Sequence, residues 1–287
     1  MKPNLTKWQS IRIWAILILL FCISVYYASF LPDADWRHKF YPLIRGFFRG
    51  ESPYWSPAFQ YPPWIVLPLF PFVIFPTDIS RGLIFVSSIL FVGFFAYKEK
   101  NNPLTIIALL ISPTVIGSLI AGNIDAILIS AIFLPPVWAL FFLMIKPQIG
   151  LGVALYYFVE IWKSKNILKG VQVFTPLVAG YAATILIFPE FLTRFLNTTS
   201  AFSIWNRSIF PYGIPIGLFL LWFSVYRKNI FYALAAAPFL SPYLTFYSYL
   251  VVQVGLSNQD VENFIRRDIL QVIFTIFLWV IMLVYKL

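Results

Sequence analysis

Residues 33–63 read DADWRHKFYPLIRGFFRGESPYWSPAFQYPP, and they form the longest polar, charged segment of an otherwise apolar chain. The segment begins with two acids two positions apart, Asp33 and Asp35, directly after the first apolar run. Further along, the i, i+3, i+4, i+7, i+8 spacing of one helical face is occupied by Phe40, Leu43, Ile44, Phe47 and Phe48. This pattern predicts an amphipathic helix in the membrane surface, with its phenylalanines in the lipid and its arginines among the headgroups.

The composition assigns the rest of the chain to the membrane. Of 287 residues, 60% are hydrophobic and 11% are charged, whereas a soluble domain carries about 25% charged residues. The net charge of +10 comes from short basic clusters at the ends of apolar runs, which indicates membrane orientation and not nucleic-acid binding. One Cys and one His exclude an internal disulfide and a His/Cys metal cluster, and we expect neither a metal nor a cofactor.

Apolar runs predict an all-α, multi-span helical bundle of about eight to ten membrane segments, in one domain over residues 1–287. Residues 31–60 are expected to be an outer catalytic loop that contains the amphipathic helix. The predicted spans are 11–31, 79–97, 103–121, 147–162, 171–189, 211–226 and 269–285, and the apolar stretch 230–256 contains the more polar SPYLTFYSY. Residues 61–76 and 124–145 are short or rich in proline and therefore predict segments that dip, tilt or re-enter.

Placing every basic cluster in the cytoplasm gives one consistent topology for a multi-pass protein of the cell membrane. The outer segments are then the 33–63 loop, 122–125, 146–148, 197–207 and 241–247. Residues 124–145 have both ends outside in this topology, so they form a re-entrant pair of half-helices around Pro135-Pro136. The alternative is a single kinked span with Lys146 inside.

Polar residues at span ends are candidates for a binding site. Asn123 and Asp125 lie where a span turns, and a carboxylate near the bilayer suggests function, although a turn residue at headgroup level is the alternative. Lys146, followed by Gln148, is either a cation for a phosphate or a snorkelling lysine.

The outer loop carries a second cationic candidate. Arg207, next to Asn206, lies outside against the positive-inside bias. It is either a guanidinium for a phosphate or a solvated loop residue.

Several short motifs, in order along most of the chain, carry a family resemblance. An acid-aromatic pair (Asp35-Trp36) is followed by G-x-x-P-Y (residues 50–54, ending in Tyr54) and by Y-P-P (residues 61–63, beginning with Tyr61). Later come G-N-I-D at 122–125, K-P-Q at 146–148, N-R-S at 206–208 and S-P-Y at 241–243. This order resembles the GT-C class of integral membrane glycosyltransferases, and within it glycosyltransferase family 87, the polyprenyl-phosphate-mannose-dependent mannosyltransferases. Tyr247 stands where that family often has a histidine.

The resemblance implies a catalytic acid in the first outer loop, a polyprenyl-phosphate sugar donor and no nucleotide. We therefore expect transfer of a hexose, most plausibly mannose, to a lipid-linked or glycan acceptor at the outer leaflet, with inversion. Asp35 is the expected general base and Asp33 the alternative. Lys146 and Arg207 are expected to steady the phosphate, and the matched motifs add Tyr54 and Tyr61 to the substrate-binding candidates.

Two other classes of function fit parts of the sequence. A lipid or sugar transporter would account for broken helices and polar residues at membrane depth. A non-catalytic scaffold subunit would account for the short chain. A transporter does not account for a long acid-bearing loop on one side of the membrane.

Overall fold

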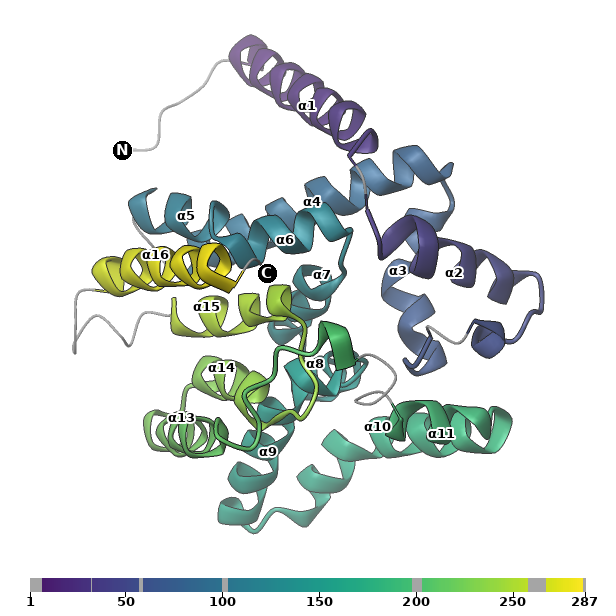
Figure 1. The fold of residues 1–287 in the computed structure, drawn as a ribbon, viewed down its shortest axis with the longest axis vertical. Coiled ribbons are helices and arrows are strands. Elements are labelled where there is room, and N and C mark those ends of the chain that lie inside the picture. Colours follow the sequence, from purple (N-terminus) through teal and green to yellow (C-terminus); the bar gives the residue numbers. More distant parts are fainter. Residues whose placement is uncertain are drawn as a thin grey trace.

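The computed structural model describes residues 7–31, 33–56, 59–99, 103–197, 203–257 and 267–285, and the regular structure of these residues is helical throughout (Figure 1). The longer helices are α1 (Lys7–Ser29), α4 (Thr77–Lys98), α9 (Pro147–Ser164), α10 (Ile167–Ile187), α13 (Ile214–Arg227), α14 (Ile230–Leu240) and α16 (Arg267–Tyr285). The shorter ones are α2 (Tyr41–Phe48), α3 (Val66–Val73), α5 (Pro103–Leu110), α6 (Pro113–Ala121), α7 (Asp125–Ser130), α8 (Pro136–Leu143), α11 (Glu190–Leu196) and α15 (Leu250–Leu256). The predicted helical bundle is confirmed.

Two of the described helices, α4 and α10, are long and apolar enough to cross a membrane. The pair α5 and α6 would make a third span if its two halves are counted together. These halves, predicted as one span over 103–121, are bent by 49°. The break has a local cause, because Ser112 accepts a hydrogen bond from the Val115 N–H and caps α6, while Pro113 occupies its first turn.

The loop after α1 folds onto the protein. A π-helical turn, Trp36–Phe40, leads into α2, which ends before Gly50 at φ +82°. Phe40, Leu43 and Ile44 are buried in the main core, while Phe48 remains 55% exposed. The helix is amphipathic as predicted, but the expectation that this whole apolar face lies in lipid is wrong, because most of it packs against protein.

The 124–145 segment is a broken hairpin. Helix α7 and a 3-10 turn, Ala131–Phe133, run to an extended Leu134-Pro135 corner, and α8 follows it. The two ends of the hairpin meet, since the Lys146 ammonium contacts the Asp125 carboxylate. This is the arrangement that a re-entrant pair requires, and it differs from a single kinked span, whose ends would lie far apart.

Close helix packing holds the remaining bundle around this hairpin. At Gly152 of α9, any Cβ would collide with the carbonyl oxygen of Ala233 in α14. The residues Ala233, Ala235, Ala236 and Ala237 are all fully buried, so small side chains let α14 pack against its neighbours at short distance. The order of segments thereby brings the turns at 122–125, 146–148 and 241–248 into one region.

Candidate functional site

The Asp35 loop is fixed by the end of α6. The Asp35 N–H donates to the Ala121 carbonyl at 2.9 Å, and α6 ends at Gly122, which has φ +67°. A Cβ at Gly122 would lie 2.9 Å from the Trp36 Cβ and 3.1 Å from the Asp33 Cβ. Glycine is therefore required here both for the left-handed backbone and for the close approach of the acidic loop.

Asp33 serves as the inner anchor of this loop. Its side chain is fully buried; Oδ1 accepts from the Arg37 N–H at 2.7 Å, and Oδ2 lies 2.8 Å from Nε of the equally buried Arg81. Arg81 also donates to the Leu119 carbonyl at 2.7 Å and so links α4, the loop and α6. The Trp36 indole N–H, which donates to Ser80 at 3.0 Å, adds a further bond to the first turns of α4.

Asp35 has a different environment, although it is only two residues away. Its Oδ2 accepts hydrogen bonds from Asn123 Nδ2 at 2.7 Å and from the Tyr247 hydroxyl at 2.9 Å. No described residue makes a hydrogen bond or ion pair with its Oδ1, and the residue is half-buried. Asp35 therefore combines an oriented carboxylate with one oxygen that can accept a proton.

A buried ion pair lies beneath Asp35. Lys146 Nζ contacts Asp125 Oδ1 and donates to Asn123 Oδ1 at 3.2 Å, and the Ser248 hydroxyl donates to Asp125 Oδ2. The side chains of Lys146 and Asp125 are 2% and 0% exposed. Asn123 thus bridges the pair to Asp35, because its amide nitrogen bonds one acid while its oxygen accepts from the lysine.

A second cation, Lys39, lies over the ring of Tyr61, close to the Lys146–Asp125 pair. Lys39 Nζ lies 4.8 Å from the Tyr61 ring centroid, and Lys146 Nζ lies 5.6 Å from it. Burial raises the pKa of the Tyr61 phenol, and nearby Lys39 opposes that effect only in part, so the ring is neutral at pH 7. Tyr54 lies one step further out and donates from its hydroxyl to the Tyr61 carbonyl at 2.9 Å.

The predicted residues of the later outer loop do not contact the acids. Asn206 donates to the Pro242 carbonyl at 2.9 Å and accepts from the Leu244 N–H at 3.1 Å, which ties its loop to the segment that carries Tyr247. Arg207 is exposed, and its guanidinium donates to carbonyls of its own loop. Gln148 is half-buried in the first turn of α9, and no hydrogen bond of its side chain to another described residue is found.

Three contributors to the cluster were not among the predicted site residues, although Lys39 was expected to favour the charged form of Asp35 and Tyr243 belongs to the matched S-P-Y motif. Ser248 bonds Asp125, Lys39 lies over Tyr61, and Tyr243 is close enough to Asp35, Asp125 and Lys146 for their charges to act on its pKa, which burial raises. Lys39 follows Asp35 by four positions, a spacing that brings two side chains to one face of a helical turn. That spacing supports the expectation that Lys39 acts on Asp35, but its contact with Tyr61 was not predicted.

Among the described residues, no three His, Cys, Asp or Glu side chains gather closely enough to hold a metal ion. Comparisons with family models, curated proteins and solved structures found no match to this chain.

The buried pair generates a stability prediction. Lys146→Met leaves the Asp125 carboxylate buried without a counter-charge, which should destabilise the fold by about 3–5 kcal/mol. The double variant Lys146→Met/Asp125→Asn removes both charges and should recover most of that loss. Thermal unfolding of purified protein in detergent measures both, with Lys163→Met, at the exposed end of α9, as the control. Equal melting temperatures for Lys146→Met and the control would contradict a structural role for the pair.

Proposed function

We propose that the chain is a membrane glycosyltransferase that transfers a hexose from a polyprenyl-phosphate carrier to a lipid-linked or glycan acceptor, with Asp35 as general base. One observation carries this proposal: of the three carboxylates in the cluster, Asp35 alone has an oxygen without a described partner. Asp33 and Asp125 are both buried against cations. The proposed relation to the GT-C class and to glycosyltransferase family 87 rests on the ordered motifs and on this geometry.

The reaction needs few groups from the protein. An acceptor hydroxyl gives its proton to Asp35 Oδ1 while its oxygen attacks the anomeric carbon. The bond from that carbon to the phosphate oxygen breaks, and the carrier phosphate leaves with the electron pair. Attack opposite the leaving group inverts the anomeric configuration. Asn123 and Tyr247 hold Oδ2 and thereby set the direction in which Oδ1 points.

The leaving phosphate requires a cation, and three are candidates. Lys146 is next to the base but already neutralised by Asp125, and Arg207 lies on an exposed loop. Lys39 is half-buried, lies over Tyr61, and reaches that hydroxyl at 3.5 Å. We infer that Lys39 makes the main charged contact to the phosphate, while Lys146 shapes the floor of the site.

We further propose that the site faces the outside of the cell membrane. The two helices that begin beside the acidic cluster have basic residues at their other ends: α4 ends at Lys98, and α9 ends at Lys163 and Lys165. The positive-inside rule assigns these basic ends to the cytoplasm.

Impermeant thiol labelling of intact cells tests this orientation. In a Cys22→Ser background, cysteines at Ser52, Gln148 and Ser208 should react from outside, whereas those at Ser164 and Lys228 should react only after permeabilisation. Protection of Gln148 together with labelling of Ser208 would contradict the re-entrant hairpin.

The base assignment predicts a large and selective loss of activity. Asp35→Asn keeps the shape and the Asn123 contact but cannot accept the proton, so transfer should fall by about 10²–10⁴-fold while donor binding persists. Thin-layer analysis of transfer from radiolabelled polyprenyl-phosphate sugars measures this. Asp78→Asn, on an exposed acid near the same loop, is the control and should keep full activity. Wild-type protein that transfers no sugar from any such donor would contradict the glycosyltransferase proposal and favour transport or a scaffold role.

The phosphate contact predicts a change in donor use. Lys39→Met should raise the KM for the donor by about tenfold or more, since a charged hydrogen bond contributes about 1.5–3 kcal/mol. Arg207→Gln should have the same effect if that loop closes over the donor. Lys39→Arg keeps the charge and should restore much of the affinity. If the Lys39→Met enzyme has an unchanged KM while Arg207→Gln does not, the phosphate contact belongs to the later loop.

A further inference from the structure

A groove lies on the outer side of α2 and α3, away from the acidic cluster. It consists of two adjoining hollows of about 310 Å³ and 420 Å³, which share Phe48 and Phe70. The rings of these two residues contact each other with centroids 5.1 Å apart. The two hollows therefore meet at this ring pair, and they differ in chemistry on its two sides.

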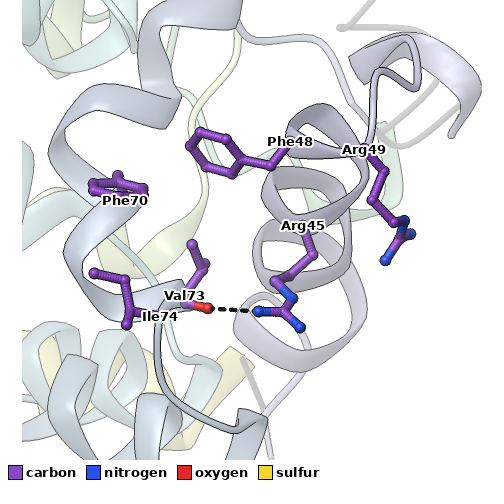
Figure 2. A pocket seen from close by; sticks show the side chains of 6 residues that line it. All are labelled: Arg45, Phe48, Arg49, Phe70, Val73 and Ile74. Carbon is purple, nitrogen blue, oxygen red and sulfur yellow. Dashed lines mark hydrogen bonds between the residues drawn. The ribbon is translucent and has the colours of Figure 1, made fainter.

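One end of the groove is cationic. Figure 2 shows Arg45 of α2 reaching toward Val73 of the facing segment, which also carries Phe70 and Ile74, while Arg49, directly after α2, extends along the outer edge of this hollow. Arg45 is exposed and donates to the Val73 carbonyl at 3.3 Å. Arg49 pairs with Glu51 at 2.9 Å, but the two side chains are 63% and 44% exposed, so solvent weakens that pair. The two arginines are one helical turn apart and keep a net positive charge together with Glu51.

The other end is apolar. It is lined by Phe47, Phe48, Pro63, Trp64, Val66, Leu67 and Phe70. Leu67 is 58% exposed and Phe70 is 44% exposed, so this wall is open at the surface. Exposed apolar side chains next to cations are what a lipid with an anionic headgroup would contact.

We propose that this groove binds an anionic phospholipid of the surrounding bilayer, with its phosphate on Arg45 and Arg49 and an acyl chain along Phe70 and Leu67. The planar guanidinium groups suit a phosphate diester, which would replace the weak contacts to Glu51 and the Val73 carbonyl. The apolar hollow contacts the acyl chain of the lipid, whereas a free inorganic phosphate would make no contact there.

The bilayer lipid is favoured over the sugar-donor lipid by the position of the groove. The groove shares no lining residue with the Asp35 cluster. Ile44 and Leu69 of the same two helices are fully buried in the core, whereas the groove is lined by exposed side chains such as Phe48 and Phe70. The proposed lipid is therefore a structural ligand of the helix pair, and its binding does not depend on sugar transfer.

Photocrosslinking to the full-length protein tests the proposal. The protein is reconstituted in phosphatidylcholine nanodiscs that contain a trace of phosphatidylglycerol with a photoreactive acyl chain, and crosslinked peptides are identified by mass spectrometry. Crosslinks should concentrate in residues 63–75, and the same probe on phosphatidylcholine should give few there. Arg45→Gln/Arg49→Gln should lower this labelling by about tenfold or more, since charged hydrogen bonds to the phosphate are lost. Lys163→Gln/Lys165→Gln, which removes two exposed cations elsewhere, should not change it.

A second variant separates lipid binding from a merely structural role of the arginines. Glu51→Gln removes the carboxylate that competes for Arg49 and should increase the labelling by phosphatidylglycerol. Equal labelling by the two headgroups, or unchanged labelling in the double arginine variant, would overturn the proposal. Displacement by polyprenyl phosphate but not by unlabelled phosphatidylglycerol would overturn it as well and would assign the groove to the donor lipid.

Discussion

The buried ion pair between Lys146 and Asp125 is the interaction on which the arrangement of the site depends. Two charges removed from water offset their desolvation only when geometry is good and their remaining hydrogen-bonding capacity is used. Here Asn123 and Ser248 supply those further bonds. The pair closes the broken hairpin of α7 and α8, and through Ser248 it also holds the segment that brings Tyr247 to Asp35. Turns far apart in the sequence are thereby fixed around one carboxylate.

The three acids of the cluster differ in their partners and not in their chemistry. Asp125 and Asp33 each have a cation in contact and no exposed side-chain surface, so they act as fixed counter-charges within the structure. Asp35 is oriented by two neutral donors, an amide and a phenol. No described residue forms an ion pair with Asp35, and both donors bind the same oxygen, Oδ2. In the proposed mechanism, Asp35 therefore has one oxygen with a defined direction. The other two carboxylates are held in place by their cations.

Much of the helical framework could be predicted from the sequence, because long apolar runs with polar ends determine it. The predicted spans at 79–97 and 171–189 correspond to Thr77–Lys98 and Ile167–Ile187. The break at Ser112-Pro113 was missed, although a serine cap followed by proline is a signal for a helix start, because the whole run is long enough for one span. The distribution of basic clusters predicts that Asn123, Asp125 and Lys146 lie on the outer side of the membrane. It does not predict their pairing, which depends on tertiary packing. Arg81 illustrates the limit, since a cation within a predicted span gives no indication of its partner until Asp33 folds against it.

The contacts of the acidic loop fix its position relative to α4, and thereby its height above the bilayer in the proposed membrane orientation. Trp36 bonds Ser80 and Asp33 pairs with Arg81, so the loop is attached to the first turns of α4. A helix of 22 residues is about 33 Å long, close to the roughly 30 Å hydrocarbon thickness of a bilayer. With α4 across the membrane, residues bonded to its first turns lie at the edge of the hydrocarbon layer. In the proposed function, a carboxylate at that level would meet a substrate whose lipid tail is in the membrane and whose reacting carbon is at the surface, as sugar transfer from a lipid phosphate requires.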